Sequence, residues 1–428
     1  MSFFWGIFSF TVYNFSGRIR SALLPFFLAS AFVLLEYSRA WFFGILWAGQ
    51  GSLLGAHWTL GNPAYLFADI GPIRQSASYW GIYGIDFFLI FVGSALFLLA
   101  RNRSHKKILS LEILSAVAIL VFLNLLTSPN RSGPEEAGLN ISVIQTAKPV
   151  RVIDPPEEVL TDFSEKNKLL KEASKISDAV IFPESADFSK TLSGFLDTAS
   201  AQKYFSALSE KNIWIIDSNK IPEPEGVKSK AMLLGSKDGV ANFYDKKLLT
   251  PGGESLPYLA AAPLWVFERV FKNDFVSSGA VFAKGMGENI LSGGNTAIKT
   301  VVCSDIISPA ISRKGKFDLM VHLENLAVFG GNRSVERQLL SMAKFRAAEN
   351  GKYLVISSNS GRSYVINSRG EVEKSTDSPG YQILTAEVVP NDERTWYNKL
   401  GDLPILLLSL VIFGYGFRKS FKNFNHVK

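Results

Sequence analysis

Cysteine and histidine are scarce in this sequence of 428 residues, which contains one cysteine, Cys303, and four histidines. A single cysteine has no partner for an internal disulfide, so cross-links do not hold the fold together. The sequence also lacks the cysteine and histidine spacing of zinc sites and any glycine-rich phosphate loop. A metal or other cofactor is therefore not expected. Cys303 is either a small buried side chain or a free thiol with a chemical role.

A long basic tract is missing as well, although the net charge is +7. The positive residues that do cluster lie beside apolar runs, at residues 101–107 and 418–428. Such clusters set the orientation of membrane proteins more often than they bind nucleic acid. Nucleic acid is therefore not an expected partner, whereas a membrane is.

Apolar residues are concentrated at both ends of the chain. Hydrophobic residues make up 47% of the sequence and the mean hydropathy is +0.15, yet residues 140–395 have an ordinary globular composition. The sequence therefore predicts four parts. They are a multi-span helical region at 1–128, a globular domain at 139–395, a C-terminal transmembrane helix at 402–417 and a basic cytoplasmic tail at 418–428.

A transmembrane helix needs about 20 mostly apolar residues. The hydropathy pattern predicts about five or six spans. The clearest candidates are 79–100, 108–127 and 403–417; the weaker ones, broken by glycine and polar residues, are 21–35 and 41–58; and 1–15 is either a short span or an interfacial segment.

The two basic clusters, at 101–107 and 418–428, predict cytoplasmic ends for the spans beside them. The globular domain between them is then expected on the outer side of the membrane. Arg18 and Arg20 would also lie outside if every earlier segment spans, which disfavours a first span. Glu36 and Arg39 are expected at the end of an apolar run, where a charge is either functional or simply reaches the lipid headgroups.

Between residues 141 and 388, short apolar runs typical of strands alternate with amphipathic runs typical of helices. This alternation predicts a layered α/β domain. The expected strands include 141–145, 178–182, 213–217, 231–234, 241–244, 297–303, 319–323, 353–357, 362–366 and 383–388, and the expected helices are 163–176, 201–211 and 335–350.

Three reactive side chains follow expected strands: Glu184, Lys246 and Cys303. The ends of strands are where α/β folds place their chemistry, because the sheet fixes the backbone there. An acid, an amine and a thiol form a complete set for acyl transfer, since the amine stabilises a thiolate and the carboxylate carries its proton. Taken singly, each residue has an ordinary alternative as a loop carboxylate, a surface amine or a core thiol.

The context of these residues makes the choice specific. Segments of the chain resemble, in one order from about residue 32 to 417, the motifs of bacterial apolipoprotein N-acyltransferases. They are Glu36-Tyr37-Ser38-Arg39, Gly81-Ile82-Tyr83-Gly84, Pro183-Glu184-Ser185-Ala186, the block from Tyr244-Asp245-Lys246 to Pro251-Gly252-Gly253-Glu254, Ala327-Val328-Phe329-Gly330, Arg346-Ala347-Ala348-Glu349, Ser358-Asn359-Ser360-Gly361 and Thr395-Trp396-Tyr397.

This resemblance implies a nitrilase-like (carbon–nitrogen hydrolase) αββα sandwich combined with a bundle of transmembrane helices. It implies Glu184 as general base, Lys246 as stabiliser of charge, Cys303 as nucleophile and Glu254 as a second essential carboxylate. The family moves an acyl chain from a phospholipid, through a thioester on the cysteine, to the N-terminal amine of a lipid-modified cysteine of an apolipoprotein. A monomer in the bacterial inner membrane, with its catalytic domain on the periplasmic side, is expected.

The sequence departs from the family pattern around the expected pocket. The family follows its cysteine with Tyr-Glu, where this chain has Ser304 and Asp305, which we expect to bind substrate or support the site. Leu326 and Val328 replace an aspartate and a tryptophan of the family, and Gly252 replaces a phenylalanine. The membrane part is short by about two spans. These differences predict a divergent member with an altered choice of lipid or acceptor, or with weak activity.

Two other classes of function remain open. A membrane-tethered amidase would hydrolyse the thioester with water, from a water-filled pocket. A non-catalytic membrane homologue would hold Glu184, Lys246 and Cys303 too far apart for contact.

Overall fold

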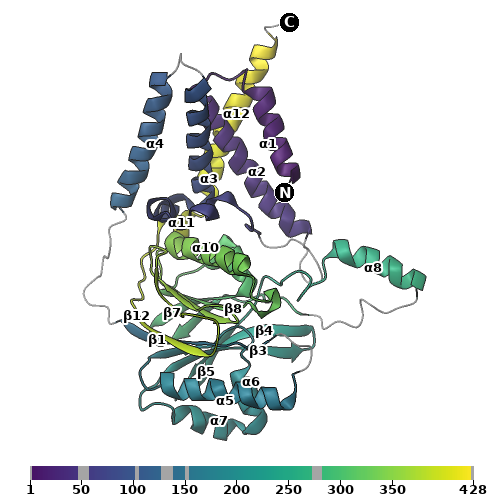
Figure 1. Ribbon diagram of the computed structural model, residues 1–428, viewed down its shortest axis with the longest axis vertical. Helices are drawn as coiled ribbons and strands as arrows, with labels where there is room; N and C mark the ends of the chain where they lie inside the picture. Colours follow the sequence, from purple (N-terminus) through teal and green to yellow (C-terminus); the bar gives the residue numbers. More distant parts are fainter. Residues whose placement is uncertain are drawn as a thin grey trace.

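The computed structural model describes residues 2–46, 57–101, 106–126, 138–149, 154–271 and 282–425. Figure 1 shows a sandwich of two sheets at one end of the molecule and a bundle of long helices at the other. The chain enters the sandwich after α4 (Lys106–Leu126) and leaves it into α12 (Leu403–Asn425), so the N-terminal helices and the C-terminal helix lie in one bundle.

Each of the two sheets has six strands, in the order β12-β1-β2-β3-β4-β5 for the first and β11-β10-β9-β8-β7-β6 for the second. The central pairs are parallel, whereas β12, β4 and β5 in the first sheet, and β6, β10 and β11 in the second, pair antiparallel with their neighbours. The strands are β1 (Leu139–Gln145), β2 (Ala179–Ile181), β3 (Trp214–Glu223), β4 (Gly226–Gly235), β5 (Gly239–Asp245), β6 (Ile290–Gly293), β7 (Thr296–Val302), β8 (Leu319–Asn325), β9 (Leu354–Asn359), β10 (Tyr364–Ile366), β11 (Val372–Ser375) and β12 (Gln382–Val388).

Helices cover both outer faces of the sandwich. The first sheet packs on α5 (Pro156–Ala173), α6 (Phe188–Phe195) and α7 (Thr198–Ser206). The second packs on α10 (Arg333–Asn350), which Figure 1 shows between the sandwich and the bundle. The αββα sandwich combined with a helical bundle, predicted from the resemblance, is therefore confirmed.

The central strands are apolar on both faces because both faces are covered. In β1, Val143 points into the core between the two sheets, and its neighbour Ile144 points outward into the core under α5. Both side chains are fully buried. This double burial explains why the sequence shows apolar runs rather than an alternation of apolar and polar residues in these strands.

The bundle contains three helices that are long and apolar enough to cross a membrane, among the described residues: α2 (Leu24–Leu46), α3 (Gly71–Arg101) and α12, over Leu403–Ser420. They lie beside two further helices, α1 (Ser2–Phe15) and α4 (Lys106–Leu126). Large apolar side chains on the outer surface of the bundle are exposed, including Leu96, Leu114 and Val411. Such a surface suits the hydrocarbon of a bilayer rather than water.

One continuous helix, α2, replaces the two interrupted segments expected at 21–35 and 41–58. Glu36 and Arg39, expected near a membrane end, lie inside this helix instead and form a buried ion pair of 2.5 Å. Asn62 donates hydrogen bonds to Glu36 and to Asp86 on α3. The charges are thus paired within the bundle, so they do not end the helix. Residues 47–56 lie outside the described residues.

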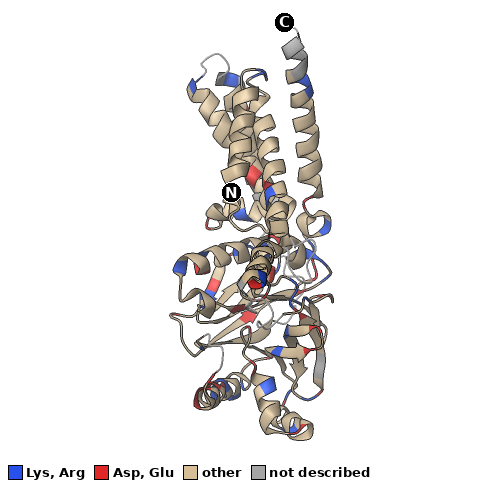
Figure 2. Ribbon diagram, turned by 90° about the vertical axis from the view of Figure 1, so that its right-hand side faces the viewer, with Lys and Arg blue, Asp and Glu red and all other residues tan. Residues whose placement is uncertain are grey.

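The continuous α2 also changes the expected place of Arg18 and Arg20. The rings of Phe15, at the end of α1, and Phe417 on α12 are 5.6 Å apart. Arg18 and Arg20 follow soon after Phe15. They therefore lie at the same end of the bundle as Arg101, the last residue of α3, and the basic residues near the end of α12. Figure 2 shows lysine and arginine gathered at this end, far from the sandwich.

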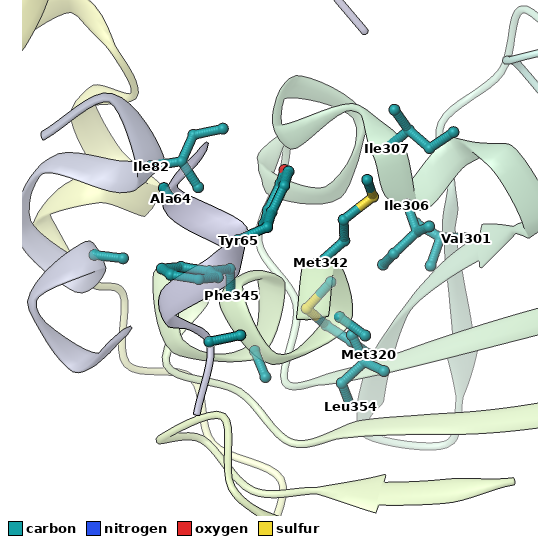
Figure 3. Packing of buried hydrophobic residues seen from close by; sticks show 14 of the residues in the cluster. Ala64, Tyr65, Ile82, Val301, Ile306, Ile307, Met320, Met342, Phe345 and Leu354 are labelled. Carbon is teal, nitrogen blue, oxygen red and sulfur yellow. The ribbon is translucent and has the colours of Figure 1, made fainter. Parts of the chain in front are cut away.

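The sandwich and the bundle meet in one continuous apolar core. Figure 3 shows Tyr65 and Ile82 from the membrane side packed against Met342 and Phe345 of α10, next to Ile306. Tyr65 lies in the short helix η1 (Pro63–Phe67), and Ile306 in the turn η3 (Cys303–Ile307). This core rigidly connects the bundle to the end of β7.

A kink at Gly81 shapes the same junction. Gly81 has φ 66° and ψ −169° inside α3, and Tyr397 of α11 (Trp396–Leu400) occupies the space where a Cβ would stand. The backbone N–H of Ile82 donates a hydrogen bond to the Glu349 carboxylate on α10. The kink therefore leaves space for Tyr397 of α11, and it lets the backbone N–H of Ile82 bond to Glu349 of α10.

Replacing Gly81 with alanine is expected to destabilise the protein, because a Cβ there collides with Tyr397 and a positive φ is unfavourable for alanine. The strain and the overpacking together amount to about 2–4 kcal/mol. Thermal unfolding of the detergent-purified chain measures the loss. Gly93→Ala in the same helix is the matched control, since nothing lies within 4 Å of the added Cβ. Equal midpoints for the two variants would contradict the role of the kink.

Candidate active site

Glu184 follows β2 in a tight backbone turn. The chain leaves the sheet at Phe182 and Pro183, and Ser185 then takes a positive φ of 58°. The Glu184 side chain is only 5% exposed, so its carboxylate lies inside the sandwich end rather than in solvent.

Lys246 follows β5 and brings a buried ammonium to Glu184. Its Nζ lies 3.0 Å from Glu184 Oε1 and 2.9 Å from Glu254 Oε1. Glu254 also accepts a hydrogen bond of 2.8 Å from the backbone N–H of Thr250 through Oε2. Because a buried charge is costly unless it is paired, these two carboxylates are what allow Lys246 to be buried.

Cys303 stands at the first position of η3, directly after β7. Its φ is 48°, a left-handed conformation that costs about 1–2 kcal/mol for a residue with a Cβ. The thiol is partly buried. Its side chain lies close enough to Glu184 and Lys246 for the charges of both to shift the pKa of the thiol. The structure thus brings together the three side chains that the sequence singled out, and Glu254 with them.

Electrostatics in this cluster favour a protonated resting thiol. Burial, and then the negative charge of Glu184, raise the pKa of Cys303 well above its ordinary value, while Lys246 lowers it. Burial also raises the pKa of Glu184, against the attraction of Lys246. For Glu254, burial opposes ionisation, but Lys246 outweighs it and lowers the pKa. Glu184 is therefore the carboxylate better matched to exchange a proton with the thiol.

Ser304 and Asp305 turn away from this cluster. The Ser304 hydroxyl donates to the carbonyl oxygen of Leu248. Asp305 is fully buried and accepts hydrogen bonds of 2.7 Å from the Tyr244 hydroxyl and from the backbone N–H of Leu248. Asp305 therefore ties the turn that carries Cys303 to the end of β5 that carries Lys246, which is a supporting position.

Two residues of β8 near this cluster were not singled out from the sequence. His322 Nε2 lies 3.1 Å from the backbone oxygen of Cys303, and burial lowers the pKa of this imidazole to about 4. A neutral His322 with its proton on Nε2 donates to that oxygen and holds the left-handed turn. Glu324 is buried beside Ser358, and burial raises its pKa to about 8. Both lie in an apolar run, and the parallel pairing of β7 and β8 brings their strand beside the end of β7 that carries Cys303.

An αββα sandwich joined to apolar helices, with a buried acid, amine and thiol at the strand ends, defines a membrane-associated α/β protein.

No family model matches the chain. Curated proteins named apolipoprotein N-acyltransferase do match it. The one from Geobacter metallireducens is 27% identical over 386 residues, covering 86% of this chain and 69% of that protein. The one from Haemophilus influenzae is 25% identical over 421 residues, covering 95% and 75%. The chain is thus a divergent relative of the apolipoprotein N-acyltransferases, as its motifs predicted.

Solved structures also align with part of the chain. A CN-hydrolase superfamily protein from Xanthomonas campestris covers 59% of this chain and 91% of its own, with 18% identity and a TM-score of 0.43. An amidase of the nitrilase superfamily from Nesterenkonia sp. AN1 covers 60% and 92%, with 19% identity and a TM-score of 0.43.

Replacing Lys246 with methionine is expected to slow alkylation of Cys303 by iodoacetamide at least about tenfold at pH 8, because loss of the ammonium raises the thiol pKa further and only the thiolate reacts. The single cysteine makes the reaction of the whole chain a direct readout. Lys247→Met is the matched control, since Lys247 lines a cavity that Glu184, Lys246 and Cys303 do not line. Equal alkylation rates in the two variants would show that Lys246 does not act on the thiol.

Glu324 should make folding stability fall as the pH rises. Its pKa is raised from 4.5 to about 8 in the folded chain. Its contribution to the free energy of unfolding is therefore fully present below about pH 4.5 and is lost as the pH rises through 8. A Glu324→Gln variant is therefore expected to gain stability relative to the parent chain between pH 5 and pH 8. Thermal unfolding at the two pH values measures this, with Glu157→Gln on the exposed face of α5 as control. A stability difference between Glu324→Gln and the parent chain that does not change with pH would refute this prediction.

Proposed function

We propose that this chain is a membrane-bound N-acyltransferase. It moves an acyl chain from a phospholipid to Cys303 as a thioester, and then to the N-terminal amine of a lipid-modified cysteine of an apolipoprotein. The observation that carries the proposal is the buried cluster of Cys303, Glu184 and Lys246, in which Glu184 and Lys246 form an ion pair, in a chain with apolar helices. The names of its relatives supply the substrate class.

In the first half of the proposed reaction, Glu184 takes the proton from the Cys303 thiol, and the sulfur attacks the ester carbonyl carbon of the phospholipid. The bond from that carbon to the glycerol oxygen breaks, and the leaving oxygen receives the proton from Glu184. A lysophospholipid leaves, and a thioester remains. A thiol that is protonated at rest suits this scheme, because Glu184 removes its proton as general base while the sulfur attacks the carbonyl.

In the second half, the amine of the acceptor attacks the thioester carbonyl. Glu184 accepts a proton from the nitrogen as the amide bond forms, and the sulfur leaves and is protonated again. The net change is one ester exchanged for one amide. Dividing the transfer into two steps at one sulfur is ordinary covalent catalysis.

Lys246 is proposed to stabilise the oxyanion of both tetrahedral intermediates, together with a backbone N–H near Ser304. Glu254 has a different proposed role. It holds Lys246 independently of Glu184, at 2.8 Å through Oε2, so that the ammonium stays in place when Glu184 becomes neutral. The motif-based assignment of Glu254 as a second essential carboxylate is consistent with this geometry.

We place the chain in the bacterial inner membrane, with residues 139–395 as the catalytic domain on the outer side. Residues 1–128 and 402–417 would form the membrane part. The support is the gathering of basic residues at the end of the bundle away from the sandwich (Figure 2), since basic ends remain in the cytoplasm.

The decisive experiment incubates membranes containing the full chain with a phospholipid labelled in its acyl chains. A labelled adduct that neutral hydroxylamine releases is expected on the parent chain and absent in Cys303→Ala. A Cys303→Ser variant is expected to lose the hydroxylamine-sensitive adduct too, because an oxygen ester resists this treatment. Addition of a lipid-modified apolipoprotein should move the label to the acceptor. No adduct on the parent chain would overturn the proposal, and release of labelled fatty acid without transfer would favour the hydrolase.

A further inference from the structure

A cavity of about 400 Å³ lies where the bundle meets the sandwich. Its walls come from α2, from α9 (Pro309–Arg313), from the start of α12 and from the segment after β5. None of the four clustered side chains, Glu184, Lys246, Glu254 and Cys303, lines it. It is therefore separate from the cluster around Cys303.

The walls of this cavity carry more positive than negative charge. Lys247, Arg313 and Lys314 line it, with Asp402 as the one carboxylate in the lining. The Asp402 carboxylate accepts a hydrogen bond of 3.0 Å from the Tyr397 hydroxyl. Among the described residues, neither Lys247 nor Lys314 forms an ion pair. The lining thus offers two ammonium groups without a bound counter-charge.

A further lysine stands directly behind the lining. Lys299 on β7 is fully buried, and its Nζ donates to Asn289 Oδ1, at 2.6 Å, and to the backbone oxygen of Lys314. Burial, and then repulsion by Lys247, lower the pKa of Lys299 to about 7. Two acids act on the charge of Lys247: Asp305, which is bound to Tyr244 and Leu248, and Glu288. The chain itself therefore leaves this group of cations short of negative charge.

The cavity lies at the level where the apolar helices begin. Leu403, the first residue of α12, and Leu406 line it together with Tyr37 and Trp41 of α2. Leu403, Leu407 and Trp41 are exposed and continue this lining along the outer surface of the bundle. Aromatic side chains next to cations at this level are typical of the lipid headgroup region. A volume of about 400 Å³ suits a headgroup but not the acyl chains as well.

We propose that this cavity binds the phosphate of an anionic glycerophospholipid, with Lys247, Lys314 and Arg313 around the phosphate and the acyl chains along α2 and α12. The excess of cations selects an anionic lipid over a neutral one. The Arg313 guanidinium already donates to the backbone oxygen of Asn398, at 3.1 Å, so it is held in place before a lipid arrives. This site does not depend on acyl transfer at Cys303.

Equilibrium binding of labelled phosphatidylglycerol to the detergent-purified full chain tests the proposal. All samples carry Cys303→Ala, so that no acyl chemistry at the thiol contributes. Adding Lys247→Gln and Lys314→Gln together is expected to weaken binding at least about tenfold, from the loss of two cations near the lipid surface. Diacylglycerol with the same acyl chains, which lacks the phosphate, is expected to bind the parent chain no more tightly than it binds this variant.

Two controls separate the cavity from general charge. Lys168→Gln with Lys171→Gln on α5 removes the same charge from the far side of the sandwich and should leave binding unchanged. Lys247→Arg with Lys314→Arg keeps the charge and should retain binding. The proposal is overturned if both glutamine pairs weaken binding equally, if diacylglycerol binds as tightly as phosphatidylglycerol, or if inorganic phosphate alone binds as tightly as the lipid.

Discussion

A single buried ammonium, that of Lys246, organises the end of the sandwich. It lies between two carboxylates from different parts of the chain, Glu184 after β2 and Glu254 beyond β5, and beside the thiol that follows β7. Leaving such a charge unpaired in the interior would cost several kcal/mol, about 3–5 by analogy with other buried pairs. The ends of β2 and β5, two strands of the first sheet, must therefore come together for Lys246 to be buried. The same arrangement places Lys246 and Glu184 beside Cys303, which follows β7 of the second sheet.

This convergence requires the two sheets to keep a fixed register at their ends. Ser357 of β9 donates from its hydroxyl to the backbone oxygen of Ile144, at 3.0 Å, across the sandwich. Asn359 accepts from the Thr146 hydroxyl at 2.8 Å and continues the same connection. Asp305 completes it from the second sheet, by holding Tyr244 of the first. Small polar residues in otherwise apolar strands thus fix the positions of side chains that are far apart in the sequence.

The sequence predicted those parts of the site that depend on local patterns. Glu184, Lys246 and Cys303 each follow an apolar strand, so the end of the sheet could be located without knowing the pairing. His322 and Glu324 could not be located in this way. They lie within a strand, and their significance arises only because β7 and β8 pair in parallel, which is a contact between distant segments. The continuous α2 was missed for a related reason. Glu36 and Arg39 interrupt an apolar run in the sequence, but their pairing makes them compatible with one helix.

The membrane bundle also forms part of the support of the thiol. The Thr59 hydroxyl, from the segment between α2 and η1, donates to the backbone oxygen of Ile307 at 2.5 Å, at the end of the turn that begins with Cys303. The apolar core that includes Ile306 continues into Tyr65 and Ile82 (Figure 3). A change in the packing of the bundle would therefore reach the turn through direct contacts. This continuity gives a physical reason why the sandwich and the helices form one structural unit.

The neighbouring lysines 246 and 247 show how one strand end can serve two environments. Successive side chains of an extended segment point to opposite sides. Lys246 consequently points into the cluster with Glu184 and Glu254, while Lys247 points into the cavity at the edge of the bundle. Carboxylates supplied by the chain hold the first ammonium, and no ion pair among the described residues holds the second. If the cavity receives a lipid phosphate, the lipid supplies for Lys247 the counter-charge that the protein supplies for Lys246. The same short segment would then fix both the chemistry of the thiol and the position of the sandwich against the membrane surface.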